Sequence, residues 1–284
     1  MEALKQLLEY LLTPSTEIFI VGALIVFILP AIVHFYIVQT TPYTSLPSIL
    51  LAGPPAAGKT SLLTLLERGD AAAATHTSQV PQSVELTVSD DHGASTFREA
   101  ARIDAPGSHR KFLLVDTPGH GKLRNQHAMT HIASNTLRGI VYVVDAASLD
   151  DGLADAASFL YDVLLALQKR TGAGKTSKAP TAIHVLVAAN KLDLFTALPA
   201  SLVKSNLEAE LGRIRRSRSK GLLDSGVGVD DIGSEEQDDW LGQYGSEKFS
   251  FGQMREFDIE VDVIGGSVLD GKVDKWWDWI SEKI

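Results

Sequence analysis

The chain of 284 residues contains no cysteine, which excludes disulfides and thiolate metal sites. Its formal net charge is −9, so positive charge is too scarce to favour direct binding to DNA. The negative charge is concentrated in positions 224–247, which hold eight acidic residues and no basic residue. Because the surrounding stretch 221–250 is also rich in glycine and serine, we expect a flexible acidic insertion there.

Charged residues are absent from positions 18–38, where His34 is the only ionisable side chain among 21 residues. As a helix this run would be ~32 Å long, close to the ~30 Å hydrocarbon core of a bilayer, and Pro30 is tolerated in such a helix. A secretory signal needs a basic start, a shorter apolar run and a cleavage site, which the start MEALKQLLEY and the following QTTPYTSLP do not show. A buried core helix is the remaining alternative. The sequence predicts a short segment 1–17, a transmembrane helix 18–38 and a linker 39–47.

Short apolar runs alternate with helical patterns from Ser48 onward. Strands are expected over 48–52, 83–88, 111–116, 139–146, 181–191 and 257–264, and helices over 61–68, 152–170, 199–216 and 273–284. This order predicts an α/β fold with a mostly parallel, doubly wound sheet and helices on both faces. The run 83–88 alternates as an edge strand does. We assign 48–284 to one domain.

A glycine-rich stretch, GPPAAGKT at 53–60, fits the phosphate-binding pattern GxxxxGK[ST] and has a predicted strand before it and a helix after it. In such a loop the backbone N–H groups point at phosphates from a helix N-terminus. Lys59 is expected to reach the β- and γ-phosphates and the Thr60 hydroxyl to ligate Mg²⁺. The candidate phosphate-binding residues are Gly53, Ala56, Ala57, Gly58, Lys59, Thr60 and Ser61. A second Gly-Lys-Thr in 170–180 lacks the first glycine and follows a helix, which favours a surface loop.

The motif DTPGH begins at Asp116, at the end of a predicted strand about 60 residues beyond the phosphate loop. An acid in this place can hold Mg²⁺ through water, and the Gly119 N–H can bond a γ-phosphate. His120 follows where a water-orienting side chain is expected, so it is the candidate catalytic residue.

The motif NKLD at 190–193 ends another predicted strand. A carboxylate at Asp193 can accept two N–H bonds from guanine, whereas adenine would leave it unpaired. Asn190, Lys191 and Asp193 are therefore the candidate guanine-binding residues of this motif.

These three motifs, in this order and spacing, resemble those of the Ras-like GTPases. With the N-terminal apolar run, the stretch THTSQVPQS at 75–83 and the closing WWDWI at 276–280, residues 17–284 resemble the beta subunits of the signal recognition particle receptor. The resemblance implies a P-loop GTPase fold that takes GTP or GDP with Mg²⁺. It also implies a single-pass protein of the endoplasmic reticulum membrane, in contact with lipid through 18–38, with its GTPase domain in the cytosol. The implied partner of the GTP-bound form is the alpha subunit, and through it the signal recognition particle and the ribosome during co-translational targeting.

The same resemblance assigns further residues. It makes Thr77 the switch residue on Mg²⁺, with Thr75 and Ser78 as alternatives, and it implies switch loops over 75–83 and 117–127. Gly265 and Gly266 would contact guanine through the backbone alone, because the family's usual Ser-Ala-Lys is absent there.

Three functions stay open at this point. The first is a receptor subunit whose GTP hydrolysis is slow or depends on a partner. The second is an actively cycling, Arf-like trafficking switch. The third, a nucleotide-hydrolysing transport or remodelling enzyme, would require more membrane spans or an adenine site.

Two other stretches have structural explanations. The basic run 213–220 favours a solvated helix face over contact with lipid head groups or RNA. The WWDWI segment predicts an amphipathic helix packed on the sheet, with Asp278 facing outward.

Overall fold

The computed structural model describes residues 16–40, 46–69, 74–89, 97–100, 109–173, 182–224, 240–242 and 248–284. The chain divides into two compact units, Met1–Ser45 and Leu46–Ile284. In the first unit, helix α2 (Thr16–Thr40) contains Pro30 and exposes large apolar side chains such as Phe27 and Phe35. The predicted span 18–38 lies within α2. Over the described parts of the chain, no helix combines the length and the apolar character that crossing a membrane requires.

The second unit is built on a six-stranded sheet in the order β2-β3-β1-β4-β5-β6. Its strands are β1 (Ser48–Ala52), β2 (Gln82–Ser89), β3 (His109–Asp116), β4 (Leu137–Asp145), β5 (Ile183–Asn190) and β6 (Ile259–Gly265). Edge strand β2 runs antiparallel to β3 over its whole length, and every other neighbouring pair is parallel. The predicted α/β class, the mostly parallel sheet and the edge position of the strand at 83–88 are confirmed.

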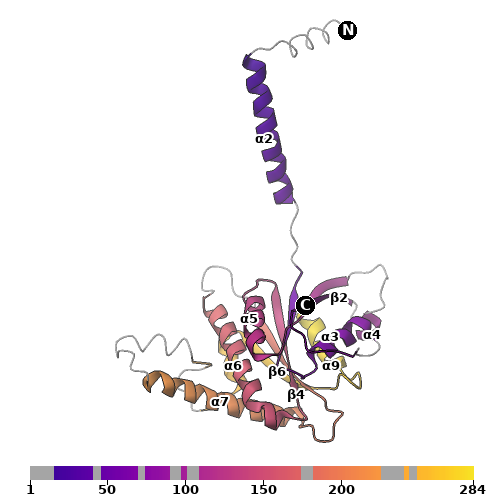
Figure 1. Cartoon of the computed structure of the whole chain (residues 1–284), viewed down its shortest axis with the longest axis vertical. Helices are drawn as coiled ribbons and strands as arrows, with labels where there is room; N and C mark the ends of the chain where they lie inside the picture. The colour runs from indigo at the N-terminus through magenta and orange to yellow at the C-terminus, as the bar shows by residue number, and fades with distance from the viewer. Residues whose placement is uncertain are drawn as a thin grey trace. The chain divides into compact units, whose positions relative to one another are not determined.

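Helices cover both faces of this sheet (Figure 1). On one side lie α5 (Gly121–Ile132), α6 (Leu149–Ala173) and α7 (Ala200–Asp224), and on the other lie α3 (Lys59–Arg68), α4 (Phe97–Ala100) and α9 (Asp274–Lys283). Consecutive residues of β1 point into different cores, so Leu50 packs in one and Leu51 in the other. This double coverage explains why β1 reads as an unbroken apolar run.

The parallel strands place the sequence motifs at one end of the sheet, where the strands finish. The carboxyl ends of β1, β3 and β5 lead into the phosphate loop, the DTPGH motif and the NKLD motif, respectively. The chain enters this unit at the other end of β1, where Ser48 begins a strand that is ~17 Å long at 3.3 Å per residue. The motifs therefore gather at the carboxyl ends of the strands, opposite the end at which the chain enters the sheet. Ligand sites of parallel α/β sheets lie at these carboxyl ends.

Helix α5 is the main departure from the predicted elements. The family resemblance implies a switch loop over 117–127, and in the structure a helix begins within it at Gly121, where the N–H groups of Leu123 and Arg124 both bond the carbonyl of His120 at 2.9 Å. The buried positions of α5 are Arg124, Ala128 and Ile132. Because an arginine takes the first of these positions, the apolar spacing that marks a helix is weak.

The basic run and the acidic insertion meet in the structure, although the insertion lies largely outside the described residues. Arg215 was expected on a solvated face, yet only 1% of it is exposed. Its Nη1 donates to the carbonyl of Leu241 at 3.1 Å, and its guanidinium lies 4.6 Å from the Trp240 ring and 5.7 Å from the Phe249 ring. The solvated-face prediction is wrong at Arg215, which holds part of the 221–250 stretch against the core.

The C-terminal part of the chain adds two elements to the core. A 3-10 helix, η1 (Phe251–Phe257), precedes β6 and buries Phe251 and Met254; the sequence does not predict it. In α9, Trp276, Trp277 and Trp279 are buried while Asp278 is exposed. The prediction of an amphipathic WWDWI helix is confirmed.

Candidate nucleotide-binding site

The loop between β1 and α3 has a shape that two of its glycines make possible. Gly53 has φ 141°, and a Cβ added there would collide with the carbonyl of Val143. Gly58 has φ 98°, and a Cβ there would collide with the amide of Asn190. Ala56 adopts φ 58°, a left-handed conformation that costs an L-residue ~1–2 kcal/mol. The two glycines of the phosphate-binding pattern are thus required by the backbone conformation and by the lack of space for a side chain.

Lys59 lies inside this loop with 5% of its surface exposed. Its Nζ donates to the carbonyls of Gly53 at 3.0 Å and Pro54 at 2.7 Å. Burial lowers the pKa of Lys59 to about 8, although the nearby Asp116 carboxylate acts in the opposite direction. The ammonium group is therefore poorly solvated, and an anion brought into the loop would gain a strong interaction with it.

Thr60 and Asp116, both predicted to act on Mg²⁺, are in contact. The Thr60 hydroxyl donates to Asp116 Oδ2 at 2.6 Å. Asp116 is fully buried, and burial raises the pKa of its carboxyl group. Its Oδ1 has no hydrogen-bond partner among the described residues. A buried carboxylate with one oxygen unsatisfied suits a hard cation such as Mg²⁺, which prefers oxygen ligands.

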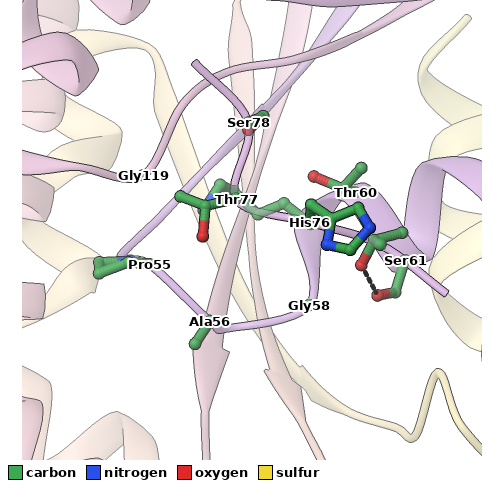
Figure 2. A pocket seen from close by; sticks show the side chains of 11 residues that line it. Pro55, Ala56, Gly58, Thr60, Ser61, His76, Thr77, Ser78 and Gly119 are labelled. Atoms are coloured by element: carbon green, nitrogen blue, oxygen red, sulfur yellow. Dashed lines mark hydrogen bonds between the residues drawn. The ribbon is translucent and has the colours of Figure 1, made fainter.

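A cavity of about 280 Å³ opens above this loop (Figure 2). It is lined by Pro55, Ala56, Gly58, Lys59, Thr60, Ser61, Thr75, His76, Thr77, Ser78 and Gly119. All three candidate switch residues for Mg²⁺ are among them, and the Thr75 hydroxyl bonds the Ser61 hydroxyl at 3.1 Å. The sequence did not single out His76, whose ring lies beside Thr60 and Ser61 in Figure 2. No motif requires a histidine at this position, and only its place next to Thr77 in the sequence indicates that it belongs to the site.

Gly119 and His120 occupy different surroundings although they are neighbours in sequence. Gly119 is buried at the cavity, and a Cβ added to it would lie 2.6 Å from Lys59 Nζ and 2.8 Å from the Pro55 nitrogen. His120 is exposed and does not belong to the cavity lining. The structure thus brings Gly119, but not the catalytic candidate His120, to the phosphate loop.

Asn190 connects the phosphate loop to the last loop of the sheet. It is 2% exposed, its Nδ2 donates to the Ala57 carbonyl at 2.8 Å, and its Oδ1 accepts from the Val268 N–H at 3.0 Å. Both ends of this amide are therefore engaged within the protein. Asn190 acts as a brace between two loops, a role that the four-residue motif does not reveal.

Asp193 is held by a side chain that the sequence analysis did not include in the site. The Ser267 hydroxyl donates to Asp193 Oδ1 at 2.6 Å and accepts from the Asp270 N–H at 3.1 Å. The expectation that the loop after β6 contacts guanine through its backbone stays a prediction, and the Ser267 side chain adds a contact to Asp193 that it did not include. No local sequence signal identifies this contact, because the two residues are 74 positions apart in the chain.

A second cavity, of about 340 Å³, lies beside Asp193 and is lined by Leu192, Asp193, Gly265, Gly266, Ser267, Lys272, Asp274 and Lys275. Lys191, which has φ 67°, directs its Nζ to Asp145 Oδ2 at 2.5 Å. Burial alone would raise the pKa of Asp145, but hydrogen bonds from Lys191, Ser148 and the Ala147 N–H lower it. The Lys191–Asp145 ion pair fixes the NKLD loop to the end of β4.

Comparison with known proteins gives a consistent result. The family model described as "Signal recognition particle receptor beta subunit" matches residues 44–257. Signal recognition particle receptor subunit beta of Saccharomyces cerevisiae is 32% identical over 243 residues, which make up 84% of each chain. The SRb-GTP/SRX complex from Chaetomium thermophilum aligns with a TM-score of 0.70 and 42% identity, covering 84% of this chain and 100% of that chain.

A second solved structure, SRb-GDP-Mg from Chaetomium thermophilum, has a TM-score of 0.62 and 45% identity, covering 86% of this chain and 100% of that chain. The family match spans the phosphate loop, the DTPGH motif and the NKLD motif, which the fold gathers at one edge of its sheet. The chain belongs to the family of signal recognition particle receptor beta subunits.

Proposed function

We propose that this chain binds GTP and GDP with Mg²⁺, and that its GTP-bound form recruits the alpha subunit of the receptor. One observation carries the nucleotide part of the proposal. The buried Asp116 with its Thr60 partner and the Asp193 carboxylate fixed by Ser267 lie at the carboxyl end of the parallel strands, and Asn190 braces the loops between them. Such an arrangement can hold a phosphate chain and a guanine base at once. The related structures from Chaetomium thermophilum are an SRb-GTP/SRX complex and SRb-GDP-Mg.

Each group in the site has a defined part in this proposal. Backbone N–H groups of residues 56–61 and the Lys59 ammonium hold the phosphates, while Asp193 accepts the N–H groups of guanine. Thr60 and Thr77 would hold Mg²⁺ directly and Asp116 through water. Mg²⁺, when bound, neutralises charge on the phosphates.

The switch segments 75–83 and 117–120 are the proposed state-dependent part of the partner surface, because residues 75–78 and Gly119 line the phosphate cavity. A tenfold preference of the alpha subunit for the GTP form requires ~1.4 kcal/mol, about the net contribution of one hydrogen bond to a charged group. The exposed position of His120 favours hydrolysis that is slow or depends on a partner. A single-turnover hydrolysis rate, measured with and without the alpha subunit, distinguishes this receptor role from an actively cycling Arf-like switch.

We further propose that residues 18–38 anchor the chain in the endoplasmic reticulum membrane, with the GTPase domain in the cytosol. The support comes from the sequence, in which 18–38 is a run of 21 residues without Asp, Glu, Lys or Arg. Extraction of microsomes with alkaline carbonate should leave the chain in the membrane pellet. Added protease should digest the domain from the cytosolic side. Release of the chain into the supernatant would contradict the anchor.

The test of the switch is a capture experiment with the full chain in mild detergent. The chain is loaded with a non-hydrolysable GTP analogue, with GDP or with neither, and incubated with the alpha subunit. We expect strong capture with the GTP analogue only. Equal capture in all three states would refute the switch, and equal affinity for ATP and GTP would refute the guanine assignment.

A further inference from the structure

Helix α5 is attached to helix α6 by one buried arginine. Arg124 is 8% exposed, and its Nη1 and Nη2 each donate to a different oxygen of Asp155 at 2.7 Å. Its guanidinium also lies 4.8 Å from the centre of the Phe159 ring, in the core. Two parallel charge-assisted bonds fix both the position and the orientation of the side chain. Asp155 itself is on the surface, with 56% of its side chain exposed.

The same arginine is joined to the phosphate loop through its own backbone. The Arg124 N–H donates to the His120 carbonyl at 2.9 Å, and His120 directly follows Gly119. Gly119 in turn packs beside the Lys59 ammonium. The positive charge of Arg124 contributes to the lowered pKa of Lys59, after the larger effects of burial and Asp116. A displacement of α5 would therefore move the backbone of Gly119.

We propose that Arg124 and Asp155 are positioning residues for the γ-phosphate: by fixing α5 against α6 they hold the backbone of Gly119 beside the Lys59 ammonium. This inference rests on the proposed binding of GTP. The γ-phosphate is the group that distinguishes GTP from GDP. The pair is therefore expected to set the ratio of GTP affinity to GDP affinity, and to leave GDP affinity as it is.

The structure contains a matched ion pair that can serve as the control. Asp162, two turns further along α6, accepts from Arg218 Nη2 at 2.8 Å, and the Arg218 guanidinium lies 4.4 Å from the Tyr161 ring. The chemistry is the same as at Asp155, with an aspartate on α6, an arginine and an aromatic ring. This second pair, however, connects α6 to α7 by a single hydrogen bond, and neither side chain bonds the loop 117–120 among the contacts described. The Asp162 charge acts on Arg124 only from a distance. Loss of either pair weakens α6, but only loss of the first releases α5.

The experiment uses the full chain with saturating Mg²⁺ and fluorescent analogues of GDP and of non-hydrolysable GTP. We expect Asp155→Ala to lower the ratio of GTP affinity to GDP affinity about tenfold, equivalent to ~1.4 kcal/mol, with GDP affinity within twofold of wild type. Asp155→Glu, which keeps the charge, should restore most of the ratio. Asp162→Ala should leave it unchanged. Hydrogen exchange at 117–123 in the GTP state should rise in Asp155→Ala alone.

Three results would overturn the inference. They are an unchanged ratio in Asp155→Ala, an equal loss of GTP and GDP affinity, and a ratio lowered as much by Asp162→Ala. Because Asp155 is on the surface, its replacement by alanine leaves no cavity in the core, whereas replacing the buried Arg124 would. The Arg124 charge does lose its partner in Asp155→Ala, and Asp155→Glu restores one. If the wild type fails to bind GTP, the proposed function fails together with this inference. Normal GTP binding with an unchanged ratio refutes the inference alone.

Discussion

Replacing Asn190 with alanine tests whether this residue is a brace between loops. The change would leave the Ala57 carbonyl and the Val268 N–H without the partners they have at 2.8 and 3.0 Å. Each unsatisfied buried group costs ~1–3 kcal/mol, so we expect a loss of about 3 kcal/mol in the free energy of unfolding. For a domain of this size that corresponds to a fall in Tm of roughly 6–12 °C. Thermal unfolding followed by circular dichroism without nucleotide measures it.

A second variant separates the two ends of the amide. Asn190→Asp keeps an oxygen for the Val268 N–H but places the other oxygen against the Ala57 carbonyl, where the amide nitrogen now donates. We therefore expect Asn190→Asp to be at least as destabilising as Asn190→Ala. Asp193→Asn, only three residues away and half-buried, should change Tm by less than either. A Tm within 2 °C of wild type for both Asn190 variants would show that the brace contributes little to stability.

The remaining predictions concern other parts of the molecule. Lys59→Ala should weaken GTP and GDP binding about 10- to 100-fold in a fluorescence titration, because it removes charge-assisted bonds to phosphate. Lys175→Ala should leave binding unchanged. A large loss of affinity in Lys175→Ala would place the phosphate site in the other glycine-rich loop. Asp193→Asn should shift preference towards xanthine nucleotides in a competition assay, since an amide can donate to their C2 carbonyl, and an unaltered guanine preference would contradict the base assignment. Arg215→Ala should lower stability by about 3 kcal/mol in urea unfolding and speed proteolysis near residue 240, because it removes ring contacts and leaves a carbonyl unpaired. Arg218→Ala should cost less than ~1 kcal/mol, as expected for a partly exposed ion pair, and equal losses at the two arginines would refute the anchoring role of the buried one.

The phosphate loop could be predicted because its requirements are local. Gly53 and Gly58 stand where the backbone adopts positive φ and where no Cβ fits, and these needs recur wherever a strand, a loop and a helix cradle phosphates. The same holds for Asp116, whose place follows from the end of a buried strand. Features set by a few consecutive residues and by strand direction are therefore visible in a single sequence.

Other parts of the site depend on partners that are distant in the chain. Ser267 bonds Asp193 across 74 positions, and Arg215 bonds Leu241 across 26. Neither pairing follows from spacing, because the loops between them can place many residues in contact. Helix α5 was missed for a different reason, since its buried stripe begins with Arg124, a charged residue that is neutralised by α6. A charge that becomes buried through a distant partner has the same pattern in sequence as a solvated one.

The course of β1 through the sheet has a practical consequence for measurement. Strand β1 of the second unit begins at Ser48, while the loops that line both cavities lie beyond the other end of the strands. A dye or a biotin attached at Leu46 would therefore lie at the end of the sheet remote from the switch segments. Single molecules immobilised through such a handle would present their nucleotide loops to the solution, so that loading and partner capture could be timed on the same molecule.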